Sequence, residues 1–177
     1  MPKDNFVSDL ESIRERARAK MMDGAVTGAY LADKDQVIEV LNEVLATEIV
    51  CVLRYKNHYY MASGIHSQAA AAEFLEHANE EQQHVDQVAQ RITQLGGNPN
   101  FNPEGLQTRA HAEYKDVDTL EQMITEDLVA ERVAIETYSE IIRWLGNDDP
   151  TTRLLIESIL KVEEEHADDL VNLLQRM

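Results

Sequence analysis

Two segments of the sequence place a glutamate three residues before a histidine. They are Glu81 with His84 in "NEEQQHVDQ", and Glu163 with His166 in "KVEEEHADDL". Residues i and i+3 of an α-helix share a face, so each pair sets a carboxylate beside an imidazole. Carboxylate oxygen and imidazole nitrogen both ligate divalent transition metals. Each pair can therefore supply half of a metal site.

Two further glutamates stand at matching distances before these pairs. Glu48 and Glu131 precede Glu81 and Glu163 by 33 and 32 residues, and each is followed by a tyrosine seven positions later. A four-helix bundle built on this repeat would bring one glutamate from each of two helices, and one Glu-x-x-His pair from each of the others, to one level. Unpaired buried carboxylates are costly, so the cluster needs cations. Two divalent ions would supply that charge.

The remaining pattern indicates helices and no convincing strand. Apolar residues recur at helical spacing through residues 36–64, 68–97 and 117–146, and again from 150 nearly to the end. The polar, proline-containing segment 98–116 is long enough to cross the end of a bundle. We predict an all-α fold: a four-helix bundle with a long crossover between its second and third helices.

The first 33 residues are predicted to form an extension that precedes the bundle. Ser8 and Glu11 fit a capping box, so we expect a short helix that Gly24 can end. The chain is thus divided into two units. Residues 1–33 form an N-terminal extension with a short helix, and residues 34–177 form the bundle.

Composition narrows the class of protein. The formal net charge is −17, which argues against DNA binding because a DNA-binding surface is cationic. Cys51 is the one cysteine, which excludes an internal disulfide and suits a reducing compartment. No apolar run reaches the roughly 20 residues of a membrane span, and the N-terminus lacks the apolar core of a secretory signal. We therefore expect a cytoplasmic location and no membrane partner.

Over residues 36–174 the sequence resembles the ferritin-like superfamily, and within it the bacterioferritins and the Dps-like ferritins. The resemblance lies in the six-ligand pattern and its spacing. It implies two iron ions per subunit, with manganese possible. The resemblance assigns terminal carboxylates to Glu48 and Glu131, bridging carboxylates to Glu81 and Glu163, and imidazole ligands to His84 and His166.

The resemblance also implies an activity. It predicts a ferroxidase that oxidises Fe(II) with O2 or H2O2, stores the Fe(III) product in a hollow homo-oligomer and so detoxifies iron. Tyr55 matches the tyrosine beside the di-iron site of many ferritins, and we assign it a redox or hydrogen-bonding role in catalysis. Tyr138, its counterpart in the second half, is expected to be a core aromatic residue with a hydrogen-bonded hydroxyl.

The sequence departs from the bacterioferritins in two places. Their haem-binding methionine follows the bridging glutamate directly, and Gln82 stands at that position, so we expect no haem. The chain ends eleven residues after His166, which leaves no room for the fifth helix of the 24-subunit cages. This resembles the Dps-like ferritins and favours a dodecamer over a 24-mer, although the cysteine pair that those proteins often carry is missing.

Two alternative functions stay open. A di-manganese catalase or a rubrerythrin-like peroxidase would turn over H2O2 without storing mineral. A structural or encapsulated cargo protein would use the six ligands to fix the bundle and the N-terminal segment to dock.

Several residues near the motifs receive less specific predictions. Glu80 is expected on a solvated face, or with Glu76 on a mineral-nucleating surface. Asp127 is a candidate hydrogen-bond partner for a ligating imidazole, or else a surface aspartate. The histidines outside the two motifs have no matched partner and are expected to be surface or core residues; they are His58, His66, His77 and His111.

Overall fold

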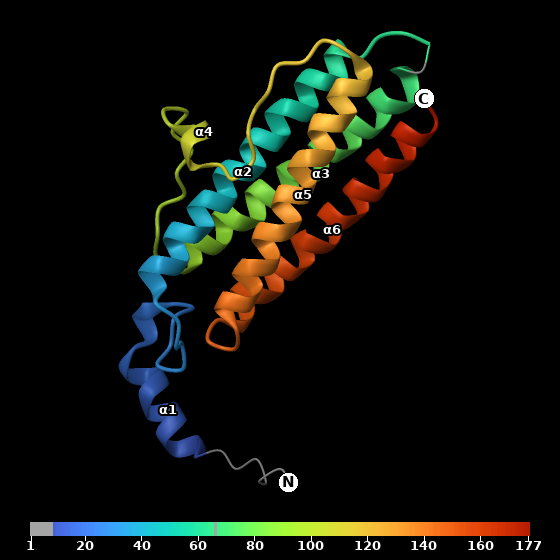
Figure 1. Ribbon diagram of the computed structural model, residues 1–177. Helices are drawn as coiled ribbons and strands as arrows, with labels where there is room; N and C mark the ends of the chain where they lie inside the picture. Colours follow the sequence, from blue (N-terminus) through green and yellow to red (C-terminus); the bar gives the residue numbers. More distant parts are fainter. Residues whose placement is uncertain (1–8, 66) are drawn as a thin grey trace, which may run out of the picture.

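The computed structural model describes residues 9–65 and 67–177, and this part of the chain contains helices and no strand. The predicted capping residue Ser8 and the histidine at position 66 lie outside the described residues. Four long helices form a bundle, and two short ones lie outside it (Figure 1). The helices are α1 (Leu10–Ala19), α2 (Lys34–Met61), α3 (Ser67–Gln94), α4 (Leu106–Arg109), α5 (Leu120–Leu145) and α6 (Pro150–Gln175).

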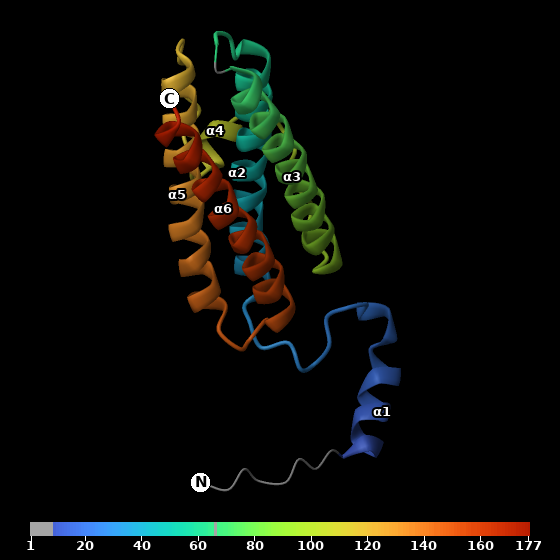
Figure 2. The same ribbon diagram turned by 90° about the vertical axis from the view of Figure 1, so that its right-hand side faces the viewer.

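The bundle consists of two helical hairpins packed against each other. α2 packs along α3, and α5 packs along α6, because each pair is joined by a short turn. The segment between α3 and α5 carries α4, which packs against α2 on the outside of the bundle (Figures 1 and 2). The four-helix bundle with a long crossover is confirmed.

Side-chain caps fix the starts of the long helices. Asp33 accepts hydrogen bonds at the start of α2, and Thr119 forms a capping box with Gln122 at the start of α5. Asp149 caps α6 ahead of Pro150, as the "NDDP" sequence indicates. These caps fix the residues at which α2, α5 and α6 begin.

The N-terminal helix is shorter than predicted. Asp9 caps α1, and the α-helix ends at Ala19; a separate 3-10 turn over Met21–Asp23 precedes Gly24. None of its residues is buried, so packing against the bundle does not stabilise this helix. Figure 2 shows α1 standing clear of the bundle. The division of the chain at residues 33 and 34 stays a prediction.

The apolar core has two clusters, one toward each end of the bundle. One cluster contains Leu45, Val88 and Ile156, and the other contains Phe74 and Leu170. Along α3, α5 and α6 the polar residues of the predicted site lie between the two clusters, and on α2 Glu48 lies between Leu45 and Val52 of the first cluster. None of the described helices combines the length and the apolar character needed to cross a bilayer.

Candidate metal centre

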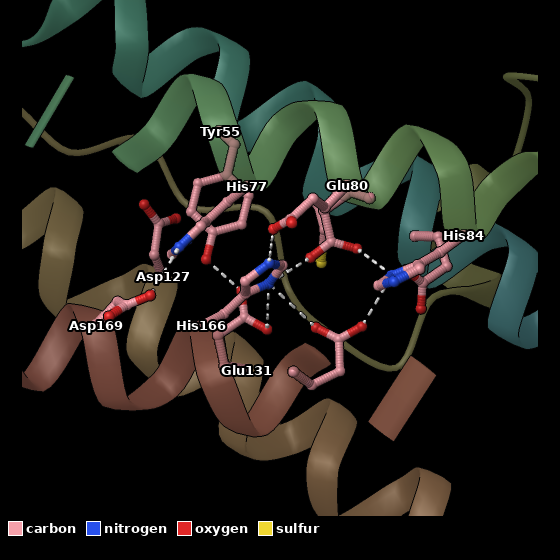
Figure 3. Close-up of polar contacts among 12 residues, drawn as sticks. Tyr55, His77, Glu80, His84, Asp127, Glu131, His166 and Asp169 are labelled. Atoms are coloured by element: carbon pink, nitrogen blue, oxygen red, sulfur yellow. Dashed lines mark hydrogen bonds and ion pairs between the residues drawn. The ribbon is translucent and has the colours of Figure 1, made fainter. Parts of the chain in front are cut away.

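The six predicted ligands come together inside the bundle. Figure 3 labels three of them, His84, Glu131 and His166. The six form two overlapping groups, and in each group one donor atom per residue lies within 4.8 Å of all the others. None of the six is more than 4% exposed. Glu81 and Glu163 belong to both groups, which is the arrangement expected of bridging carboxylates. The first group adds Glu48 and His84, and the second adds Glu131 and His166.

Oxygen atoms crowd around one nitrogen of each imidazole. Nδ1 of His84 lies 3.1 Å from Glu48 Oε2, 3.2 Å from Glu163 Oε1 and 3.4 Å from Glu81 Oε2. Nδ1 of His166 lies 3.5 Å from Glu81 Oε1 and 3.6 Å from Glu163 Oε2. A single N–H can satisfy one such oxygen well, not three. The donor atoms therefore converge on space that suits a cation.

Several of these atoms lack hydrogen-bond partners among the described residues. The unpartnered atoms of the centre include Oε1 of Glu81, Oε2 of Glu131, Oε1 of Glu163 and Nδ1 of His166. Leaving a buried polar group unsatisfied costs about 1–3 kcal/mol. Two divalent cations would satisfy these atoms together, and mixed oxygen and nitrogen donors suit iron or manganese. The residues present thus fit two such ions.

The same crowding shifts the acid–base properties of the centre. Burial, and then repulsion from Glu81 and Glu163, raises the pKa of Glu48 and of Glu131 well above the usual range. Burial alone would lower the pKa of His166, but hydrogen bonds to the neighbouring carboxylates outweigh it and raise the pKa to about 12. Cations that bind here compete with protons, because metal ligands must be deprotonated.

Both tyrosines of the repeated pattern contact the centre. Tyr55 on α2 donates a hydrogen bond to Glu131 on α5, and Tyr138 on α5 donates one to Glu48 on α2. The side chains of both tyrosines are fully buried. Tyr138 is a core aromatic residue with a hydrogen-bonded hydroxyl, as expected, but its partner Glu48 is a predicted ligand, so it also contacts the centre. The repeat of glutamate and tyrosine seven residues apart was the signal that could have identified its role.

Glu80 also reaches the centre, contrary to the prediction of a solvated face. Its Oε2 lies 2.7 Å from Nε2 of His166, although the side chain is 40% exposed. The carboxylate accepts the Nε2 hydrogen of His166, which directs Nδ1 toward the other carboxylates. Outer carboxylates commonly orient metal-ligating histidines in this way.

Asp127 contacts no predicted ligand, so the proposed bond to a ligating imidazole is corrected. Its Oδ1 accepts a hydrogen bond from Nε of Arg54 at 2.7 Å, and its Oδ2 lies 2.8 Å from Nδ1 of His58. All three side chains are buried. His58 therefore has a partner that its sequence position did not suggest. The pairing crosses from α2 to α5, which is why the spacing along one helix could not show it.

The two remaining described histidines differ in their surroundings. His77 is buried, as a core histidine was expected to be, and its ring stacks on His166 with 3.9 Å between ring centroids. Burial, and then the proximity of His166, lowers the pKa of His77 to about 3. His111 is partly exposed, and its Nδ1 lies 3.2 Å from Oγ1 of Thr47.

The fold and this cluster define a ferritin-like protein. The chain belongs to the ferritin-like domain family, whose pattern matches residues 38–177. Its relatives include bacterioferritins and Dps proteins. It is 30% identical over 134 residues to a bacterioferritin of Desulfovibrio desulfuricans, covering 75% of this chain and 71% of that protein. It is 27% identical over 156 residues to the DNA protection during starvation protein of Halobacterium salinarum, covering 85% of each.

Solved structures give the same result for the fold. The bacterioferritin-related protein of Bacteroides fragilis, a dodecameric thioferritin, matches with a TM-score of 0.79 and 30% identity, over 82% of this chain and 88% of that one. Dps from Thermosynechococcus elongatus matches with a TM-score of 0.76 and 23% identity, over 80% and 91%. The predicted ferritin-like fold and the resemblance to bacterioferritins and Dps-like proteins are confirmed.

Proposed function

We propose that this protein is a ferroxidase that stores and detoxifies iron. In this proposal two Fe(II) ions bind as substrate, one in each of the overlapping ligand groups, and O2 or H2O2 accepts their electrons. The observation that carries the proposal is the sharing of Glu81 and Glu163 between the two groups. Shared carboxylates would hold two ions close enough to give up electrons together. One H2O2 would take up two electrons, one from each Fe(II), and two protons to give two water molecules, and one O2 would take up the same electrons and protons to give H2O2.

Two features of the chain's own residues support redox chemistry at this place. The ligands are carboxylates and imidazoles, which accommodate both Fe(II) and Fe(III). The centre is buried in the bundle, and a hollow lined by Glu80, Gln83 and His84 lies over it between α3 and α6. That hollow offers a short route by which small oxidants and cations could reach His84.

Tyr55 is assigned a catalytic role beside the metal ions. Its hydroxyl donates to Glu131 and thereby holds one terminal carboxylate in position. Its ring also lies edge-on to His166, with 6.3 Å between centroids. A tyrosine so placed can supply an electron or a proton during oxidation. Tyr55→Phe should slow Fe(II) oxidation. Tyr138→Phe removes the equivalent hydroxyl beside Glu48 and so controls for the loss of a hydrogen bond to a ligand.

The proposed assembly is a hollow homo-oligomer, with a dodecamer favoured over a 24-mer. The Bacteroides fragilis protein, which is described as dodecameric, supports this choice. One relative is named for DNA protection, but the net charge of −17 opposes direct contact of this chain with DNA. We expect no DNA binding.

An anaerobic titration tests the proposed activity. Metal-free protein receives Fe(II), then O2 or H2O2, and Fe(III) absorbance is followed against iron added per subunit. We expect fast oxidation of the first two irons, continued oxidation after that, and soluble Fe(III) eluting with a large assembly. Glu163→Gln should remove the fast phase, and Glu164→Gln, at the exposed neighbouring position, should retain it.

The same experiment separates the alternatives. Oxidation that ends at two irons, or gas evolution from H2O2 with manganese in place of iron, would replace storage by a di-manganese catalase or a peroxidase. Absence of any oxidation together with loss of stability in Glu163→Gln would favour a structural or cargo role.

A further inference from the structure

A third group of metal-ligating side chains lies beside the six-residue centre. Glu73 and His77 on α3 and Asp169 on α6 each place one donor atom within 4.8 Å of the other two. In Figure 3, His77 and Asp169 lie on the opposite side of His166 from His84. No predicted ligand of the centre belongs to this group.

His77 is the unexplained member of the group. The side chain is only 2% exposed, yet its Nδ1 has no hydrogen-bond partner among the described residues. Its Nε2 points at two carboxylates, Glu73 Oε2 and Asp169 Oδ2, and lies 3.9 Å from each. These distances are too long for hydrogen bonds. Nε2 therefore faces two carboxylate oxygens without a hydrogen bond to either, and a cation between them would give all three atoms a partner.

A divalent cation fits between these three atoms. Metal bonds to imidazole nitrogen and carboxylate oxygen are about 2.1 Å long. Two ligand atoms on opposite sides of one ion are therefore about 4 Å apart, which matches the 3.9 Å between Nε2 and each oxygen. Glu73 and Asp169 are 36% and 52% exposed, which leaves them free to adjust and leaves the position open to solvent. One imidazole with two carboxylates suits Fe(II), Mn(II), Co(II) or Zn(II) better than calcium or magnesium.

We propose that Glu73, His77 and Asp169 form a third divalent-cation site that loads the buried centre. The His77 ring is stacked on the ring of His166, so the third site lies one side chain away from the centre. It is more exposed and has fewer ligands than either group of the centre, and cations would therefore move inward from it. Donor residues recur about one turn apart along α3 and α6, at positions 73, 77, 81 and 84 and at 163, 166 and 169.

The loading role rests on the proposed ferroxidase function, whereas the existence of the site does not. Cation counting tests the site by itself. Metal-free protein is titrated with Co(II) without oxygen, bound Co(II) is counted by dialysis, and anomalous diffraction from Co(II)-soaked crystals locates each ion. We expect three ions per subunit in the native chain and two in Glu73→Gln/Asp169→Asn. Asp168→Asn, which removes one negative charge at the exposed adjacent position, should keep three.

Stopped-flow oxidation of Fe(II) tests loading. At iron concentrations below saturation, Glu73→Gln/Asp169→Asn should react about tenfold more slowly than the native chain, as expected when a site of entry is weakened. At saturating iron the two rates should agree, because the centre itself is unchanged. Both substitutions lie on the surface, so folding is not at risk, and His77 stays in place.

The outcomes are distinct. Two Co(II) ions in the native chain, with none at His77, would overturn the third site. Three ions with equal oxidation rates at every iron concentration would overturn loading and leave the site. Failure of every chain to oxidise iron would overturn the ferroxidase function, and the Co(II) count would still decide the third site.

Discussion

The hydroxyl of Tyr138 on α5 donates a hydrogen bond to the carboxylate of Glu48 on α2. The reverse contact joins Tyr55 on α2 to Glu131 on α5. Each of these two helices thus supplies one glutamate, and its tyrosine donates a hydrogen bond to the glutamate of the partner helix. The repeat seen in the sequence becomes a reciprocal pair of contacts, and it couples the two helical hairpins at the level of the centre.

Removing one hydroxyl of this pair should destabilise the metal-free protein. Tyr138→Phe leaves a buried oxygen of Glu48 without its donor, so we expect a loss of about 1–3 kcal/mol in the free energy of unfolding. Denaturant unfolding of the metal-free chain measures it. Tyr55→Phe should give a similar loss because its contact is the mirror image. Equal stability of native and Tyr138→Phe protein would show that the hydrogen bond contributes nothing.

Replacing Glu131 with glutamine should separate folding from metal binding. The amide oxygen can still accept from Tyr55, and one carboxylate fewer is buried beside Glu81 and Glu163, so metal-free stability should equal or exceed that of the native chain. Native protein should gain about 2.7 kcal/mol at Zn(II) one hundred times its dissociation constant. Thermal unfolding with and without Zn(II) should show this gain in Glu136→Gln, an exposed control, and a smaller gain in Glu131→Gln, which keeps the ligand group that lacks Glu131.

Glu80 should act on metal affinity through His166. Glu80→Ala removes the acceptor for Nε2 of His166, so the imidazole can turn, and metal affinity should fall by about 10–100-fold. Competition with a chromophoric chelator measures the affinity. Glu80→Gln, which keeps an acceptor oxygen, should recover part of it, and the exposed control Glu164→Ala should change nothing. Equal affinity of Glu80→Ala and native protein would leave Glu80 as a surface residue only.

The six residues of the centre could be predicted because their signal is local and repeated. Glu81 with His84, and Glu163 with His166, occupy one helical face at fixed spacing. A second glutamate at a matching distance before each pair then specifies how helices must pair. Such a pattern needs no knowledge of which helix packs where. The start of α6 could be predicted for a similar reason, because Asp149 and Pro150 contact residues close to them in sequence.

The residues that were missed depend on packing between helices. Glu80 is turned away from the face of Glu81 on α3, and it reaches the centre because α6 brings His166 to it. Asp127 does share a face with Glu131, but the side chains that meet it, Arg54 and His58, come from α2. Which residues of other helices a helix face contacts depends on tertiary packing. Periodicity along one helix cannot predict those contacts.

The charge on Asp149 should make stability depend on pH. Burial acts to raise its pKa, but hydrogen bonds from Thr152 and the charge of Arg91 outweigh this and lower it. A carboxyl whose pKa is lower in the folded state stabilises the fold above its unfolded pKa of about 4. That stability is lost as the pH falls through the folded-state value.

The substitution Asp149→Asn isolates this effect, because asparagine still caps a helix. At pH 7 the native chain should be more stable than Asp149→Asn by about 1–3 kcal/mol, as for hydrogen bonds to charged groups. The difference should shrink as the pH falls below the unfolded pKa of about 4 and through the lower folded-state pKa. Urea unfolding at a series of pH values measures it, with the exposed Asp148→Asn as control. A difference that stays constant with pH would contradict a role for the charge.

The buried pair of Arg54 and Asp127 should be costly to break from one side. Both side chains are at most 1% exposed, and their atoms approach to 2.7 Å. Asp127→Ala leaves the guanidinium buried without its counter-charge, which should cost about 3–5 kcal/mol of unfolding free energy. In a background of Arg54→Met the same change should cost much less, since no cation is left unpaired, and the exposed Asp168→Asn should be neutral. Denaturant unfolding of the four chains of this double-mutant cycle gives the coupling energy. Additive losses would mean that the two charges do not stabilise each other. The carbonyl oxygen of Glu113, which also accepts a hydrogen bond from Arg54, would then be sufficient to satisfy the guanidinium.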